Sequence, residues 1–122
     1  MKKVEAVIRP DRLQAVQDAL DALGTSGLTV IEVLGCGRQR GYTETYRGAR
    51  ANISLQRKVK VEAVVADSSA AAVVDAIAGA AKTGEVGDGK IFVLPVEEAI
   101  RIRSGEHGED VVRHLQPEHW GH

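Results

Sequence analysis

The sequence predicts an α+β fold of the ferredoxin-like type, a (βαβ)2 sandwich in which a long loop joins the two halves. Apolar and polar residues alternate in both halves, which indicates strands, and apolar residues at helical spacing follow a strand in each half. Residues 37–55, between the halves, show neither pattern. Two helices would cover only one face of a four-stranded antiparallel sheet, so apolar residues on the other face predict an oligomer.

The first half is predicted as strand, helix and strand. Residues 3–9 alternate between apolar and polar side chains, which is typical of a half-buried strand. Pro10 suits the first turn of the following helix, and Gly24 is placed to end it. Residues 28–35 are rich in β-branched side chains and predict the second strand. The residues expected to face the core are Val4, Ala6 and Ile8 in the strand and Leu13, Val16, Leu20 and Leu23 in the helix.

The second half repeats this order. Residues 58–65 alternate and predict the third strand. Asp67 and the two serines after it form a helix start signal, and the alanine-rich helix should run through Ala81 and pack close to the sheet. The last strand should run from Lys90 to about Val96, and a proline near its end favours the edge of the sheet. A further short extended piece should follow.

Residues 82–90, Lys-Thr-Gly-Glu-Val-Gly-Asp-Gly-Lys, predict an anion site. Their three glycines allow positive φ, and successive N–H groups in such a turn can surround an anion. Lys90 adds a mobile charge, while Arg101 and Arg103 would project from one face if that segment were extended. Together these groups suit a polyphosphate. The alternative interpretation is an ordinary glycine-rich turn between a helix and a strand.

The same run also has the glycine and lysine spacing of a P-loop, but its context excludes that site. A P-loop follows a strand, opens a helix and places Ser or Thr after the lysine. Here the run follows the predicted helix and opens a predicted strand, and Ile91 follows Lys90.

Composition and charge narrow the class of protein. A chain of 122 residues fits one domain. The net charge of −1 gives no field that would attract nucleic acid. A single cysteine, Cys36, suits a reducing cytoplasm, and neither a signal-peptide core nor an apolar run of the ~20 residues needed to span a bilayer is evident. We therefore expect a cytoplasmic protein.

The end of the chain is polar. Residues 105–122 contain four histidines and one tryptophan, which raises the question of a metal site. No spacing among them fits a standard ligand pattern, so a flexible tail is the prediction.

The sequence resembles the PII nitrogen-regulatory signal-transduction family from Met1 to about Glu109. Short motifs carry the resemblance, in the order in which the family has them. They are Lys3-Val-Glu-Ala-Val-Ile-Arg-Pro10, Gly27-Leu-Thr-Val30, Gly37-Arg-Gln39, Thr43-Glu-Thr-Tyr-Arg-Gly48, Val59-Lys-Val-Glu62, Thr83-Gly-Glu-Val-Gly-Asp-Gly-Lys-Ile-Phe-Val93, Pro95-Val-Glu-Glu98 and Arg101-Ile-Arg-Ser-Gly-Glu106. The resemblance implies a cytoplasmic homotrimer with a PII-type domain at 1–109, a T-loop at about 37–55 and a tail at 110–122.

The resemblance further implies that ATP or ADP binds between subunits. By position, the residues that would hold the phosphates are Gly37, Arg38, Gly87, Asp88, Gly89, Lys90, Arg101 and Arg103. The residues that would line the adenine pocket are Thr29, Glu62 and Val64.

In the family, ATP with Mg²⁺ creates a second site, for 2-oxoglutarate. Gln39 matches the residue whose oxygen completes the Mg²⁺ shell, and Lys58 matches the lysine that pairs with the distal carboxylate. The backbone of Arg40 and Gly41 would close over this ligand, and Gly87 belongs to the same site. The alternatives are a solvated amide for Gln39 and a charged strand edge for Lys58.

The T-loop implied by the resemblance docks on target proteins. Tyr46 and Arg47 would contact the partner, and Arg47 corresponds to an arginine that plugs an ammonium channel in some members. Ala51 stands where many members carry a tyrosine that is uridylylated or adenylylated, and Ala49 lacks the hydroxyl that some relatives phosphorylate. Alanine offers no nucleophile, so ligand occupancy alone should control the loop.

The resulting prediction is a non-catalytic regulator whose target is an ammonium channel, a nitrogen-assimilation enzyme or a regulator. Any membrane contact would be indirect, through a channel partner. One alternative is a weak ATP-hydrolysing enzyme, for which Asp88 and Glu62 are the nearest bases, although neither has a His or Ser partner. Another is a related sensor of bicarbonate or AMP. Nucleic-acid binding through the basic loop is not expected.

Overall fold

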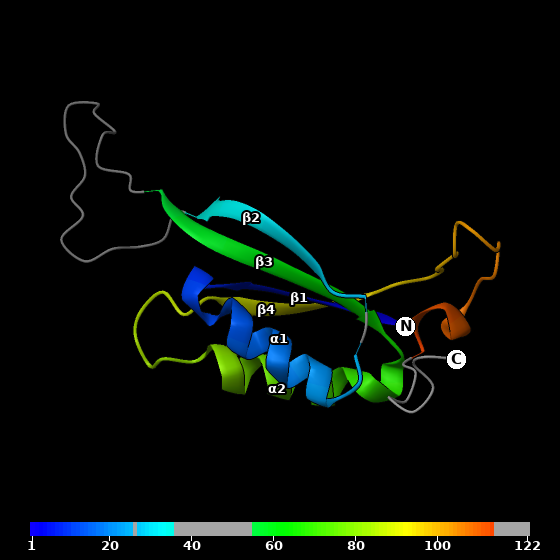
Figure 1. Cartoon of the computed structure of the whole chain (residues 1–122), viewed down its shortest axis with the longest axis horizontal. Helices are drawn as coiled ribbons and strands as arrows, with labels where there is room; N and C mark the ends of the chain where they lie inside the picture. The colour runs from blue at the N-terminus through cyan, green and yellow to red at the C-terminus, as the bar shows by residue number, and fades with distance from the viewer. Residues whose placement is uncertain (26, 36–54, 114–122) are drawn as a thin grey trace.

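The computed structural model describes residues 1–25, 27–35 and 55–113 (Figure 1). Along the chain, the elements are β1 (Lys2–Ile8), the short 3-10 helix η1 (Pro10–Arg12), α1 (Leu13–Ala22), β2 (Thr29–Gly35), β3 (Gln56–Val65), α2 (Asp67–Ala81), β4 (Lys90–Pro95) and the 3-10 helix η3 (Glu109–Val112). This is the expected order of two βαβ halves.

The four strands form one antiparallel sheet in the order β2-β3-β1-β4. Helices α1 and α2 lie side by side along one face of this sheet, and no helix of the described residues lies over the other face (Figure 1). The prediction of an α+β, ferredoxin-like fold is therefore confirmed. Strand β4 lies at an edge, as the proline at its end indicated.

The core fills the space between the two helices and the sheet. The strand residues predicted to face inward are all buried, because every second side chain of a strand points to the same face. Leu23 differs from the prediction: α1 ends at Ala22, and the Leu23 side chain is 42% exposed. The buried core residues are Val4, Ala6, Ile8, Val16, Leu20, Val59, Val61, Ala63, Val65, Val73, Ile77 and Ala81.

The start of α2 was located correctly, but it is not capped as the sequence suggested. Ala66 is the cap residue and no side chain caps the helix, while the N–H of Ser69 donates to the Ala66 carbonyl at 2.9 Å. The Asp67 carboxylate instead forms an ion pair with the amino group of Met1 at 3.0 Å. This pairing lowers the pKa of Asp67.

An arginine from η1 holds the other end of α2. The Arg12 guanidinium donates to the Ala80 carbonyl through Nε at 3.0 Å and through Nη2 at 2.7 Å. The last carbonyls of a helix have no partner within the helix and carry partial negative charge. Arg12 therefore satisfies one of them and ties η1 to the end of α2.

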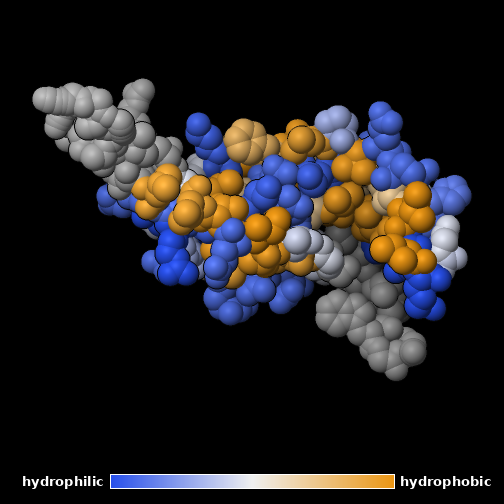
Figure 2. Space-filling view, turned by 90° about the horizontal axis from the view of Figure 1, so that it is seen from above, coloured by the Kyte–Doolittle hydropathy of each residue, from blue (hydrophilic) through white to orange (hydrophobic). Residues whose placement is uncertain are grey.

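The sheet face away from the helices, here called the open face, mixes charged and apolar side chains. Figure 2 views the molecule from above the sheet and shows hydrophobic patches separated by hydrophilic ones. Ile31, Phe92 and Leu94 are 38%, 50% and 38% exposed. The register places all three on the open face, since they lie opposite or beside Lys60, Glu5 and Lys3. No helix in the described part of the chain has the length and apolar character needed to cross a bilayer.

Candidate functional site

The segment that links α2 to β4, residues 82–89 and here called the glycine loop, is folded around the carboxylate of Asp88. Its Oδ2 accepts hydrogen bonds from the backbone N–H groups of Thr83 and Gly84, each at 2.8 Å. Its Oδ1 accepts from the Thr83 hydroxyl and from Arg9 Nε, the latter at 3.0 Å. The loop thus surrounds an anion supplied by its own chain.

These donors also set the charge of Asp88. The Thr83 hydroxyl, followed by the Thr83 N–H and the Arg9 guanidinium, holds the pKa of Asp88 far below its usual range. Each of these bonds favours the ionised carboxylate over the neutral acid. Asp88 is therefore a fixed negative charge inside the loop.

Two basic side chains, one just after β1 and one on β3, bond to backbone carbonyls of the glycine loop. Arg9, directly after β1, donates from Nη2 to the Val86 carbonyl at 2.7 Å. Lys58, on β3, donates from Nζ to the Gly87 carbonyl at 2.8 Å. The structure therefore brings together Lys58 and Gly87, which sequence reasoning assigned to the same 2-oxoglutarate site.

The three glycines of the loop have the positive φ that the sequence predicted, at 90°, 100° and 101° for Gly84, Gly87 and Gly89. Gly89 has a second constraint, because a Cβ there would lie 1.7 Å from the Val7 carbonyl oxygen. At Gly87, a Cβ would come within 3.3 Å of Arg9 Nη2. At Gly89, the loop can pass this close to the backbone of Val7 only because glycine has no side chain.

The prediction that Arg101 and Arg103 lie in an extended segment is wrong. Ile100 pairs with His107, and the chain between them turns back on itself. The Arg101 N–H donates to the Glu106 carbonyl at 2.7 Å, and the Gly105 N–H donates to the Arg101 carbonyl at 2.8 Å. We call residues 101–106 the arginine turn. Arg101 Nε also pairs with the Glu106 carboxylate at 3.0 Å.

The glycine loop and the arginine turn lie at opposite ends of the sheet (Figure 1). Strand β4 begins at Lys90, next to the glycine loop, and ends at Pro95, on the side of the arginine turn. Six residues of strand correspond to roughly 20 Å. One chain therefore does not bring Lys90 together with Arg101 and Arg103.

The residues assigned to the adenine pocket lie on the open face of β2 and β3. Thr29 is directly opposite Glu62 in the register, and Val64 follows on the same face of β3. This face also carries a charge network, because Lys3 contacts Glu5 at 3.0 Å and Glu62 at 3.9 Å. The hydrogen bond between Lys3 and Glu5 raises the pKa of Lys3 and lowers that of Glu5. Lys60 contacts Glu62 at 3.4 Å.

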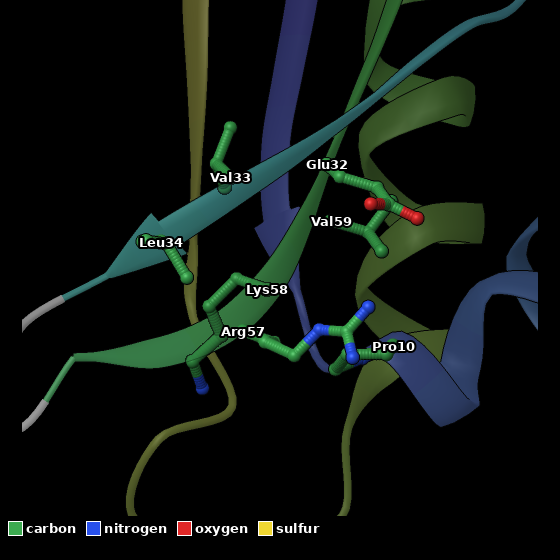
Figure 3. Close-up of a pocket in the computed structure, with 7 residues that line it drawn as sticks. All are labelled: Pro10, Glu32, Val33, Leu34, Arg57, Lys58 and Val59. Atoms are coloured by element: carbon green, nitrogen blue, oxygen red, sulfur yellow. The ribbon is translucent and has the colours of Figure 1, made fainter.

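A hollow of about 470 Å³ lies where β2 and β3 approach η1 (Figure 3). Figure 3 shows the side chains of Arg57 and Glu32 over the same face of the two strands, with Arg57 reaching toward Pro10. The residues that line the hollow are Pro10, Glu32, Val33, Leu34, Arg57, Lys58 and Val59. Sequence reasoning did not predict this hollow.

Several of the predicted site residues lie outside the described residues. They include the expected Mg²⁺ ligand Gln39, the partner-contact pair Tyr46 and Arg47, and Ala51. The others are Gly37, Arg38, Arg40 and Gly41. Residues 114–122 also lie outside, so the prediction of a flexible tail without a metal site is not tested.

Sequence reasoning missed two residues that organise the site, Arg9 and Thr83. Arg9 contacts Asp88 but lies 79 positions from it in the sequence, so no local sequence pattern connects the two. The signal for Thr83 was available, because a hydroxyl and a carboxylate within one glycine-rich turn often bond to each other and to the turn's N–H groups.

Comparison with known proteins gives one consistent result. The family model described as "Nitrogen regulatory protein P-II" matches residues 1–106. Proteins with that same name from Cereibacter sphaeroides and Rhizobium meliloti are each 55% identical over 112 residues, which is 92% of this chain and 100% of theirs. One from Nostoc punctiforme is 54% identical over the same coverage.

Proposed function

Because this chain belongs to the P-II family of nitrogen regulatory proteins, we propose that it senses ATP or ADP together with 2-oxoglutarate. It then controls nitrogen-metabolism targets through the T-loop at 37–55. The protein acts in the cytoplasm as a binding regulator without an activity of its own. The PII-type domain spans residues 1–109, and the tail spans 110–122.

The observation that carries the proposal is the separation of the glycine loop from the arginine turn. The glycine loop supplies close-approaching backbone and the charge of Lys90 at one end of β4, while Arg101 and Arg103 lie at the other end. Both sets of groups suit phosphate. A triphosphate held by both must lie between two chains, with the glycine loop of one facing the arginine turn of the next.

The open face supports a homotrimer as the assembly that creates such junctions. Ile31, Phe92 and Leu94 leave apolar surface exposed there, and no helix in the described part of the chain lies over it. Exposed apolar patches of this kind mark contact surfaces. In the trimer, Thr29, Glu62 and Val64 line the adenine pocket, and Gly37 and Arg38 join the glycine loop around the phosphates.

The second ligand is 2-oxoglutarate, bound next to the nucleotide. Lys58 already lies at the glycine loop, so its ammonium is close to where phosphates would bind and is suited to a carboxylate. Gln39 would give its side-chain oxygen to Mg²⁺, a hard ion that prefers oxygen. The backbone of Arg40 and Gly41 completes the pocket, together with Gly87.

The T-loop signals the bound ligands to a target protein through Tyr46 and Arg47. These two residues contact an ammonium channel, a nitrogen-assimilation enzyme or a regulator. Membrane contact occurs only through such a channel partner. Ala51 excludes nucleotidylation at that position, since it has no hydroxyl. The loop is therefore controlled by which ligands are bound, as a shift in its population of states.

Isothermal titration calorimetry of the full chain tests the proposal. We expect 2-oxoglutarate to bind with measurable heat when ATP and Mg²⁺ are present, and not when they are absent or when ADP replaces ATP. Lys58→Met should abolish the 2-oxoglutarate heat and leave ATP binding in place. A protein that binds ATP but gives no ATP-dependent 2-oxoglutarate heat would instead be a sensor of another anion, such as bicarbonate or AMP.

A further inference from the structure

The Asp88 carboxylate occupies donors that an anion-binding loop would otherwise offer to a ligand. Four hydrogen bonds converge on it, from the Thr83 N–H and hydroxyl, the Gly84 N–H and Arg9 Nε. The donors in the first half of the glycine loop, at Thr83 and Gly84, are thus already bonded to the Asp88 carboxylate. The other half, with Gly87 and Gly89, is left for phosphate, together with Lys90 at the start of β4.

We propose that Asp88 and Arg9 form a positioning pair, which fixes the glycine loop in its nucleotide-binding shape before the nucleotide arrives. In this role the Asp88 side chain touches no phosphate, and only the backbone around it does. The proposal rests on the nucleotide binding proposed above, which it deepens.

Electrostatics argues against direct contact between the Asp88 side chain and phosphate. A carboxylate beside a triphosphate would repel it, whereas the structure turns this carboxylate toward a guanidinium. The Asp88 side chain is 24% exposed and that of Arg9 is 28% exposed, so the pair is partly shielded from solvent. Asp88 therefore acts on the loop and not on the ligand.

Arg9 is well placed to hold the loop rigidly. It bonds to Asp88 through Nε and to the Val86 carbonyl through Nη2, so one planar group fixes two points of the loop. Its own backbone is restrained by Pro10, which favours the extended conformation that Arg9 adopts at φ −68° and ψ 141°. The loop is thus anchored to the end of a central strand.

A loop fixed in advance loses less conformational entropy when a ligand binds. We expect Asp88→Asn to weaken ATP binding about tenfold, the scale of a lost charge-assisted hydrogen bond at a partly exposed site. ADP should weaken by the same factor, and the factor should not depend on Mg²⁺. Arg9→Met should have the same effect, and the double variant should be no worse than either single variant.

The alternative roles of Asp88 predict different results in the same titrations. If Asp88 faced the phosphates directly, Asp88→Asn would tighten binding, and more for ATP than for ADP. If it bound Mg²⁺, the loss would appear only with the metal. Either result, or additive losses in the double variant, would overturn the positioning pair.

Hydrogen exchange of the nucleotide-free protein gives a readout that does not depend on binding. The amides of Thr83 and Gly84 donate to Asp88, so Asp88→Asn should speed their exchange. Thr83→Val should do the same in part, and Thr83→Ser, which keeps the hydroxyl, should restore protection. Glu85→Gln is the matched control, since it removes a charge from the same exposed loop at a side chain outside the cluster, and it should change neither readout.

The two proposals can fail separately. If the wild-type chain binds no ATP while exchange responds as described, the nucleotide proposal fails and the positioning pair stands as a loop-ordering device. If ATP binds but Asp88→Asn leaves both affinity and exchange unchanged, the positioning pair is refuted and the proposed function stands.

Discussion

At the scale of single residues, Gly89 is the position with the least freedom in the glycine loop. A side chain there would have to overlap the Val7 carbonyl, at 1.7 Å from the added Cβ. Because backbone would have to move, Gly89→Ala should lower the free energy of unfolding by about 3 kcal/mol, the scale of a severe local clash. Urea denaturation followed by circular dichroism measures this change.

Gly84→Ala is the matched control for that experiment. Gly84 also has a positive φ, of 90°, but no atom of the residues that the structure describes lies within 4 Å of an added Cβ. It should therefore lose only about 1 kcal/mol, the cost of the backbone conformation alone. If the two variants lost equal amounts of unfolding free energy, the close approach to the Val7 carbonyl would not explain the effect at Gly89.

Asp88 also predicts a pH dependence of stability. Its pKa is lowered by folding, so its contribution is present in full above the ordinary carboxyl pKa of 3.8 and is lost as pH falls further toward the folded-state pKa. The difference in unfolding free energy between the wild type and Asp88→Asn should be constant from pH 7 to pH 5. It should shrink below pH 4, as measured by urea denaturation, and a difference that grows there would contradict the assigned cause.

The residue scale also shows where sequence reasoning stops. The spacing of glycines in residues 82–90 was enough to predict positive φ and close approach, because both follow from the missing Cβ. The role of Arg9 was not predictable, because its contact with Asp88 spans 79 positions and forms only after the sheet has brought β1 and the loop together.

At the scale of elements, the end of α2 depends on an arginine from another element. Arg12 places two N–H groups on the Ala80 carbonyl, and α2 has no basic residue of its own in its last turn. Arg12→Met should cost about 1–2 kcal/mol of unfolding free energy, through the lost hydrogen bonds and the lost charge near the helix C-terminus.

Arg12→Lys separates those two contributions. Lysine keeps the charge but cannot present the planar pair of donors, so its loss should fall between the wild type and Arg12→Met. Thermal and urea unfolding of the three proteins would test this order. If Arg12→Met were as stable as the wild type, the Arg12 contact would not hold the helix end.

Elements were predicted best where periodicity decides the structure and worst where a turn overrides it. The alternation in residues 58–65 gave the buried face of β3 correctly, although the strand begins earlier, at Gln56. The pattern Arg101-x-Arg103 also alternates, yet it is no strand. Gly105, at φ 77°, and the contact from Ser104 to Glu106 turn the chain there instead.

At the scale of the whole molecule, the proposed trimer depends on contacts made by the open face. Phe92 is 50% exposed at the edge strand of this face. Phe92→Asp should place a charge in the proposed contact between subunits and shift a trimer to monomers, because an unpaired buried charge is costly. Light scattering coupled to gel filtration measures the mass.

Leu23→Asp provides the comparison on the other side of the molecule. Leu23 is 42% exposed at the end of α1, on the helix side, so the same substitution there should leave the mass unchanged. If both variants remain trimeric, the open face is not the contact surface. If the wild type is already a monomer, the proposed assembly is wrong.

The placement of the glycine loop and the arginine turn at the two ends of the sheet has a consequence for mixed assemblies. In the proposed ring, each chain lends its loop to one neighbour and its turn to the other, so no chain can complete a site by itself. A variant with substitutions only in the glycine loop, and one with substitutions only in the arginine turn, would each bind no nucleotide as a pure assembly. In mixed assemblies of the two variants, a nucleotide site would form again wherever an unchanged glycine loop faces an unchanged arginine turn.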